Sequence, residues 1–286
     1  MSEPEARGRM PTTRMDQTDH RKAKDSHGQG ALELADLARF RQVAYRLFST
    51  MLLYPDEERL KTVSAVAGEL GDQGDFLVTF PFFIQWSKLL DTLQRLTDMK
   101  PARVQEEYVD VFLFNPDYSP NLPYESAYLG SGAAATGWTA VGLEREYAAA
   151  GLSISPALKE PPDHAAVELE FMAFLCDQEA CAWQGRRLVD GIKSLKHQAA
   201  FLERHLSRWF PTFARGVAGR ESSQVYAVVT GTAQSFIIHD RDLLEALLKR
   251  FGSGADPQPA DSVSKTPTQG RGRCHRTEKT PPQKRA

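Results

Sequence analysis

Hydrophobic residues recur at three- and four-residue steps along most of the chain. Between residues 34 and 54 the apolar positions are Leu37, Phe40, Ala44, Leu47, Phe48 and Met51. This spacing places the side chains on one face of an α-helix, so the stretch is predicted to be helical. Similar stripes, bounded by prolines, glycines or polar loops, predict helices over residues 55–70, 82–96, 101–112, 141–150, 162–183, 187–209 and 225–251.

Two segments fit this pattern less simply. The stretch "QVYAVVTGTAQSFII" at residues 224–238 has a composition typical of strands, but a lone strand among helices would have no partner, so we predict a buried helix. Residues 115–137 contain three prolines and many other turn formers, which predicts an irregular loop of the kind that often carries function. The predicted fold is all-α, a single bundle of about nine to eleven helices.

The two ends of the chain differ from this middle part. Residues 1–30 contain no Leu, Ile, Val or aromatic residue, and residues 253–286 contain one Val among Pro, Gly, Thr and basic residues. Such segments bury too little apolar surface to offset the entropy lost on ordering them. We therefore predict disordered tails at residues 1–30 and 253–286, on either side of one helical domain at residues 31–252.

Charge narrows the kind of partner that the chain can bind. The two tails hold 13 of the 35 basic and 8 of the 37 acidic residues, which leaves a net charge of −7 in residues 31–252. An acidic body argues against nucleic acid and suits a basic partner. The chain has no apolar run of membrane-spanning length and no secretory signal, so we expect a cytoplasmic protein. Cys176 and Cys181 are predicted to be buried thiols in a reducing compartment.

A cluster of acidic residues precedes one apolar run. Glu160, Asp163, His164, Glu168 and Glu170 lie within eleven residues, directly around two prolines. In the simplest interpretation Asp163 is the N-cap of an ordinary helix, because acidic residues near a helix start are stabilised by its dipole. A second interpretation is a metal-dependent enzyme that uses His164, Glu168 and Asp163, although no second histidine lies nearby.

A third interpretation is binding without chemistry. An acidic helix start beside a proline-rich loop could hold a peptide that carries arginines and an apolar segment, with Tyr124 and Glu125 of the loop at its rim. Neither a Gly-x-Ser-x-Gly elbow nor a phosphate-binding glycine motif occurs in the chain, which argues against a hydrolase or a nucleotide-dependent enzyme.

Four blocks in this order add a family resemblance. They are "EEYVDVFLF", "PNLPYES", "GLEREYAAAGL" and "EPPDHAAVELEFMAFL", within residues 104–175. In order and spacing they resemble the TorD/DmsD family, with its NarJ-type relatives, which are chaperones for the maturation of molybdenum-containing redox enzymes. The blocks carry the Tyr-x-x-x-Phe, Pro-x-Glu-Ser, Glu-x-Pro-Asp-His and Glu-Leu-x-Phe-Met patterns of that family.

The resemblance implies an all-α chaperone and no enzymatic activity, cofactor or metal. Its partner would be the catalytic subunit of a dimethyl-sulfoxide-reductase-type molybdopterin enzyme, together with the twin-arginine signal peptide of that subunit. The chaperone would assist cofactor insertion and prevent premature export, without binding nucleic acid or inserting stably into a membrane. A monomer and a domain-swapped dimer both remain possible. The predicted client-binding residues are Tyr124, Glu125, Glu160, Asp163, His164 and Glu168.

Other conspicuous residues receive a structural interpretation. Trp86, Trp183 and Trp209 lie at helical core spacing and are predicted to be packing residues. His197, His205 and His239 are scattered along the chain and are predicted to lie at the surface or at helix ends, as in most proteins.

Overall fold

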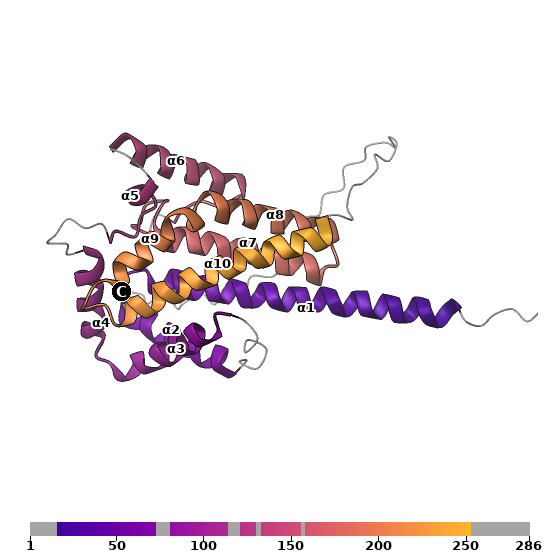
Figure 1. Ribbon diagram of the computed structural model, residues 1–286, viewed down its shortest axis with the longest axis horizontal. Helices are drawn as coiled ribbons and strands as arrows, with labels where there is room; N and C mark the ends of the chain where they lie inside the picture. Colours follow the sequence, from indigo (N-terminus) through magenta and orange to yellow (C-terminus); the bar gives the residue numbers. More distant parts are fainter. Residues whose placement is uncertain (1–15, 73–80, 114–120, 130–132, 156–157, 253–286) are drawn as a thin grey trace, which may run out of the picture.

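The computed structural model describes residues 16–72, 81–113, 121–129, 133–155 and 158–252 (Figure 1). Side chains are described for these residues except 16–29, 72, 97 and 133–138. Ten α-helices make up the described part: α1 (Asp16–Met51), α2 (Glu57–Asp72), α3 (Phe83–Gln94), α4 (Pro101–Tyr108), α5 (Ser126–Leu129), α6 (Ala133–Ala149), α7 (Ala165–Gln184), α8 (Leu188–Arg204), α9 (Leu206–Ala218) and α10 (Val225–Gly252). A 3₁₀ turn (Arg95–Asp98) extends α3, and a π-helical turn (Val109–Leu113) extends α4.

The all-α prediction is confirmed. No strand occurs in the described ranges; the one extended pairing is an isolated antiparallel bridge between Tyr124 and His164. The β-prone residues 224–238 lie within α10 almost entirely, as predicted. No helix in the described part of the chain is both long and apolar enough to span a membrane. The predicted tail at residues 253–286 lies outside the described residues, and α1 already begins at Asp16, within the predicted N-terminal tail.

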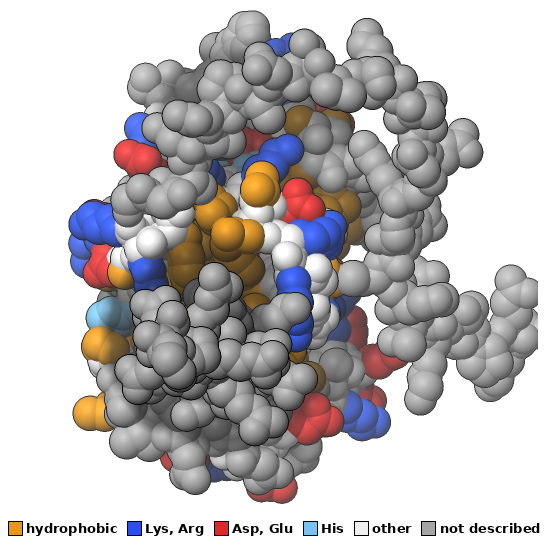
Figure 2. Space-filling model, turned by 90° about the vertical axis from the view of Figure 1, so that its right-hand side faces the viewer, with side chains coloured by type: hydrophobic (Ala, Val, Ile, Leu, Met, Phe, Trp, Pro, Cys, Tyr) orange, Lys and Arg blue, Asp and Glu red, His pale blue; other side chains and the backbone are white. Residues whose placement is uncertain are grey.

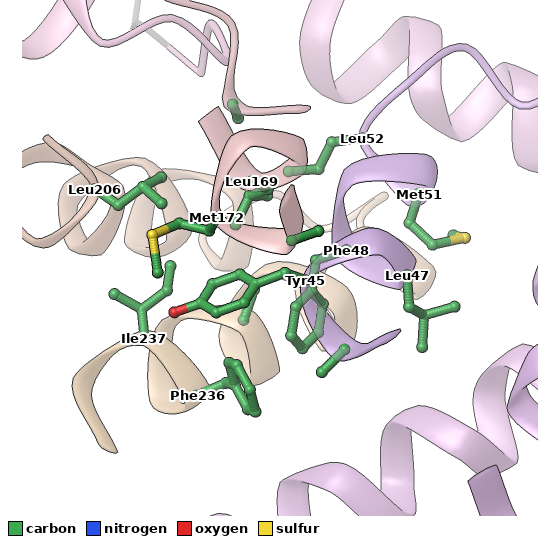
Figure 3. Close-up of a cluster of buried hydrophobic side chains, with 14 of the residues drawn as sticks. Tyr45, Leu47, Phe48, Met51, Leu52, Leu169, Met172, Leu206, Phe236 and Ile237 are labelled. Atoms are coloured by element: carbon green, nitrogen blue, oxygen red, sulfur yellow. The ribbon is translucent and has the colours of Figure 1, made fainter. Parts of the chain in front are cut away.

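Helix α7 lies at the centre of the bundle. Most of its residues are buried, mainly alanine, leucine, phenylalanine, methionine and cysteine, while Glu170 and Gln178 mark one exposed stripe. Helix α1 packs along it, and α8 and α9 contact it on other sides. Helix α10 packs against α8 and α9, and the pair of α2 and α3 lies beside α10 through α3 (Figure 1). Figure 3 shows the apolar cluster in which Tyr45 and Phe48 of α1, Met172 of α7, and Phe236 and Ile237 of α10 lie together.

The predicted packing residues lie in this core. Trp86, Trp183 and Trp209 are all buried, and so are Cys176 and Cys181. At the end where α1 projects, hydrophobic side chains gather in a hollow bordered by charged ones (Figure 2). The loop that contains Tyr124 is near α5, at the other end of the molecule.

Two predictions of helix boundaries are wrong. Residues 187–209 form two helices, because the backbone leaves the helical region at His205 (φ −120°, ψ −99°). The apolar stripe continues across this break, since α8 and α9 both face the same core, and so the pattern did not reveal it. Residues 133–137 belong to α6, and α5 forms a further short helix inside the predicted loop; alanine-rich sequence favours helix despite the neighbouring glycines.

Candidate functional site

Two segments that are distant in the sequence meet at the start of α7. The backbone N–H of Glu125 donates to the carbonyl oxygen of Asp163 at 2.9 Å, and the N–H of Ala165 donates to the carbonyl oxygen of Pro123 at 2.8 Å. These two hydrogen bonds form the bridge between Tyr124 and His164. The structure thereby brings the proline-rich loop and the acidic cluster together in one place.

Asp163 is not the N-cap of α7, contrary to the simplest interpretation of the sequence. Its carboxylate is buried and accepts a hydrogen bond of 3.3 Å from the backbone N–H of Ser126, the first residue of α5. Asp163 therefore fixes the beginning of α5 across the bridge. The tertiary contact redirects a side chain that would otherwise be well suited to cap its own helix.

His164 is the N-cap of α7. Its Nδ1 accepts a hydrogen bond of 3.0 Å from the backbone N–H of Ala166, so the ring proton of the neutral imidazole is on Nε2. The ring is 1% exposed, lies edge-on to Tyr124, and has Nε2 3.6 Å from a carboxylate oxygen of Glu160. Burial lowers the pKa of His164 to about 4, so the imidazole is neutral at pH 7.

Glu168 lies one turn further along α7 and is fully buried. Its Oε2 accepts a hydrogen bond of 3.2 Å from the indole N–H of Trp209, while Oε1 has no hydrogen-bond partner among the described residues. Burial raises the pKa of Glu168 well above its usual value, and the nearby charges of Glu125 and Asp163 raise it further. Its surroundings therefore favour the protonated form of the Glu168 side chain.

Glu125 points inward and meets His205, a residue that the sequence did not associate with the site. The Nδ1 of His205 is 2.9 Å from Oε2 and 3.2 Å from Oε1 of Glu125, and Nε2 is 3.4 Å from Oε2 of Glu146 on α6. Arg204 also pairs with Glu146. His205 does lie at a helix end, as predicted, but its position in the sequence gave no sign of its two partners.

The pKa values in this group follow from the contacts. Burial alone would lower the pKa of His205, but hydrogen bonds to Glu125 and Glu146 and the charges of both carboxylates raise it above its usual value. Burial would raise the pKa of Glu146, whereas its contacts with His197 and His205 and the charge of Arg204 lower it to about 2. The two carboxylates thus favour the imidazolium form of His205.

The six predicted residues divide into a buried set and a surface set. Glu125, Asp163, His164 and Glu168 are buried, and only Tyr124 and Glu160 reach the surface, both half-buried.

Close to Tyr124 and Glu160, Tyr54 is 44% exposed and its ring lies 5.6 Å from that of Tyr108, centroid to centroid. Burial raises the pKa of Tyr108, and the charges of Glu160 and Tyr124 raise it further, which places all three side chains in one neighbourhood. We call the part of this neighbourhood formed by Tyr54, Tyr124 and Glu160 the aromatic-acidic surface.

The metal-enzyme interpretation finds no matching geometry in the described part of the chain. No three His, Cys, Asp or Glu side chains are grouped there so that they could hold a metal ion. The Nδ1 of His164 is occupied by the N–H of Ala166, and Glu168 faces the indole of Trp209. The three residues that this interpretation requires therefore serve three separate contacts.

Comparison with known proteins identifies the family. Residues 84–215 match the model of the family described as nitrate reductase delta subunit. The chain is 29% identical over 163 residues to the chaperone protein TorD of Vibrio cholerae, covering 56% of this chain and 72% of that protein. It is 30% identical over 158 residues to the chaperone protein TorD of Vibrio atlanticus, covering 54% and 72%.

A shorter match, 34% identical over 98 residues, is to the selenate reductase assembly chaperone protein of Thauera selenatis, covering 34% of this chain and 45% of that protein. The chain belongs to the TorD family of chaperones. The prediction of a chaperone for molybdoenzyme maturation is thus confirmed, and the metal-dependent enzyme is not favoured.

Proposed function

We propose that this chaperone acts in the cytoplasm on the catalytic subunit of a molybdopterin enzyme and binds the twin-arginine signal peptide of that subunit at the aromatic-acidic surface. It holds the subunit until the cofactor has been inserted and thereby delays export. The observation that carries the proposal is the bridge between Tyr124 and His164, because it brings the half-buried ring of Tyr124 close to the carboxylate of Glu160.

The chemistry of this surface suits an arginine. A guanidinium group pairs with a carboxylate through two hydrogen bonds and stacks on aromatic faces. Glu160 supplies the carboxylate, and the exposed Tyr54 and the half-buried Tyr124 supply aromatic rings. Leu122, which is 41% exposed beside Tyr124, offers a contact for an apolar residue that follows the arginines. The net charge of −7 in residues 31–252 favours the approach of a basic peptide.

The four buried residues of the predicted site support this surface from below. The backbone N–H of Glu125 donates to the carbonyl oxygen of Asp163, and the carboxylate of Asp163 accepts from the N–H of Ser126, so both residues hold the loop. His164 caps the start of α7 at the bridge. Glu168 lies beneath them against Trp209. In this proposal the peptide touches Tyr124 and Glu160, whereas the buried residues fix their positions.

The test is calorimetric titration of the full chain with a twin-arginine signal peptide and with the same peptide in which both arginines are glutamine. Glu160→Gln should weaken binding of the arginine peptide by about tenfold, because a charge-assisted hydrogen bond is lost. The matched control is Glu170→Gln, which removes a carboxylate that lies on the exposed side of α7 and pairs with Arg46 at 3.2 Å. It should change the affinity by less than about twofold.

The outcomes separate the parts of the proposal. Equal weakening by both variants would mean that the peptide responds only to the net charge of the body, and the assigned surface would be wrong. Tight binding that is indifferent to the arginines would also reject this surface. If the full chain bound no twin-arginine peptide, signal-peptide recognition would be rejected, and the folded catalytic subunit would be the remaining candidate ligand.

A further inference from the structure

His205 holds two carboxylates that belong to different elements. Its Nδ1 lies 2.9 Å from Glu125 and its Nε2 lies 3.4 Å from Glu146. A neutral imidazole carries one N–H and can donate to one of them, whereas an imidazolium donates to both. The two carboxylates around His205 therefore favour its imidazolium form. His164 differs, because its Nδ1 accepts a hydrogen bond and so must be unprotonated.

The two carboxylates lead to the segments that build the proposed peptide site. Glu125 follows Tyr124 directly, and its own N–H forms half of the bridge to the start of α7. Glu146 lies on α6, next to Tyr147, whose hydroxyl donates to the carbonyl oxygen of Pro162 at 2.9 Å. His205 itself is the residue at which α8 ends and α9 begins. One ring thus joins the loop, α6 and the junction of α8 and α9.

Of the two carboxylates that contact His205, Glu125 depends more on the positive charge of His205 than Glu146 does. Glu146 also has Arg204 and His197 of α8 within ion-pair distance, so it keeps a cation if His205 becomes neutral. Glu125 faces Asp163 and Glu168 from the side of α7, and both are acidic. Its ion pair with His205 is the only one found for Glu125 in the described part of the chain.

We propose that His205 is a positioning residue: as an imidazolium it fixes Glu125, and with it Tyr124, so that the chaperone binds its client peptide less tightly once His205 loses its proton. This inference rests on the proposed function of the aromatic-acidic surface. Deprotonation leaves Glu125 among acidic groups without a cation, and the segment at residues 121–129 loosens from the junction of α8 and α9.

The direction of the pH effect follows from the proton count. In the proposed peptide-bound state His205 is protonated. Above the pKa of His205 in the free protein, most free molecules carry the neutral ring. Binding must then take up a proton, so the apparent dissociation constant rises by up to about tenfold for each pH unit above that pKa. His164 cannot produce this profile, because its pKa of about 4 leaves it neutral throughout this range.

The experiment is titration of the full chain with the twin-arginine peptide over roughly pH 6 to 9. In the wild-type chain the affinity should fall as pH rises; in His205→Gln it should be weak at low pH already and nearly flat. The matched control is His239→Gln on α10, since that ring packs on Phe82 and has no ion pair among the described residues. It should reproduce the wild-type profile. A wild-type profile in His205→Gln would overturn the proposal.

A second measurement needs neither peptide nor variant. The ring pKa of His205 can be measured by nuclear magnetic resonance, and amide hydrogen exchange reports the opening of the N–H groups of Glu125 and Ala165. Their protection, corrected for the intrinsic effect of pH, should fall as His205 titrates. If peptide binding failed at every pH, the proposed function would be rejected, and this measurement would still decide the role of His205. A ring pKa below about 6.5, or protection that is independent of His205, would overturn it.

Discussion

Two groups of polar side chains are buried in this bundle, and they are satisfied to different degrees. The Arg41 cluster consists of Arg41, Tyr45, Glu179, Gln198 and Asp240, contributed by α1, α7, α8 and α10. The Glu168 cluster consists of the buried Glu125, Asp163 and Glu168 and the partly buried His205, beneath the bridge between Tyr124 and His164. Both use a glutamate of α7, yet their hydrogen bonding differs.

In the Arg41 cluster every carboxylate has several donors. The guanidinium of Arg41 contacts Asp240 through two nitrogens and Glu179 at 2.6 Å. Tyr45 donates to Asp240 at 2.6 Å, and the amide of Gln198 donates to Glu179 at 2.9 Å. A buried ion pair satisfied in this way locks the relative positions of the helices that supply it.

The Glu168 cluster has fewer donors. Glu168 receives one hydrogen bond, from Trp209, and keeps an unpartnered oxygen in the described structure. Burial and the neighbouring carboxylates instead favour the protonated form of Glu168, and the carboxylates beside His205 favour its protonated form. The saturated cluster is therefore a structural anchor, whereas the other is a set of titratable groups beside the proposed binding surface. The stability of the two regions should respond differently to charge removal and to pH.

The largest effect is expected for Arg41→Met. Removing the guanidinium leaves Glu179 and Asp240 buried without their cation, which should reduce the free energy of unfolding by about 3–5 kcal/mol in urea denaturation. The matched control is Arg46→Met, also on α1, whose ion pair with Glu170 is half exposed. The control should cost less than about 1 kcal/mol. If both variants lost the same free energy of unfolding, the buried Arg41 cluster would stabilise the fold no more than the surface ion pair of Arg46 with Glu170.

A smaller, pH-dependent effect is expected for His164→Asn. Asparagine also caps helices but does not titrate. The pKa of His164 is about 4 in the folded chain, below its usual value, so the unfolded chain binds the proton more readily. Wild-type stability should therefore fall, relative to the variant, as pH drops below about 6.5, by about 3 kcal/mol at pH 4.

Urea denaturation of wild type and His164→Asn across this pH range measures the difference. His239→Asn is the control, and its difference from wild type should not follow the same course. A constant difference between wild type and His164→Asn would show that folding does not lower the pKa of His164.

The smallest effect is expected for Glu168→Gln. The folded-state pKa of Glu168 is raised, so the carboxyl group costs stability as pH rises above its unfolded pKa, and a neutral amide does not. Between roughly pH 5 and pH 6 the variant should gain about 1 kcal/mol relative to wild type. Glu179→Gln in the Arg41 cluster should instead be destabilised throughout, because it weakens an ion pair. If Glu168→Gln lost stability as pH rose, the carboxyl group would be ionised rather than protonated.

Much of the local structure could be predicted from the sequence. Three- and four-residue spacing located the helices, since an amphipathic stripe needs no knowledge of its partner. Tyr124, Glu160 and His164 were predicted as site residues from short motifs whose members lie close together in the chain. Asp163 shows the limit of such reasoning: its sequence position suits an N-cap of α7, but its carboxylate turns to Ser126 across the bridge. The break at His205 was missed for a similar reason, because a continuous apolar stripe does not distinguish one helix from two.

The sequence by itself determined the all-α class, the positions of most helices and the family, because each depends on residues near one another along the chain. Only the tertiary structure decided which polar residues are buried and with whom they pair. Arg41 meets Asp240 across 199 positions, and Glu125 meets His205 across 80. A buried charge is tolerated only when an oppositely charged or hydrogen-bonding partner lies beside it. Here the partner belongs to another helix, so the pairing depends on how the helices pack.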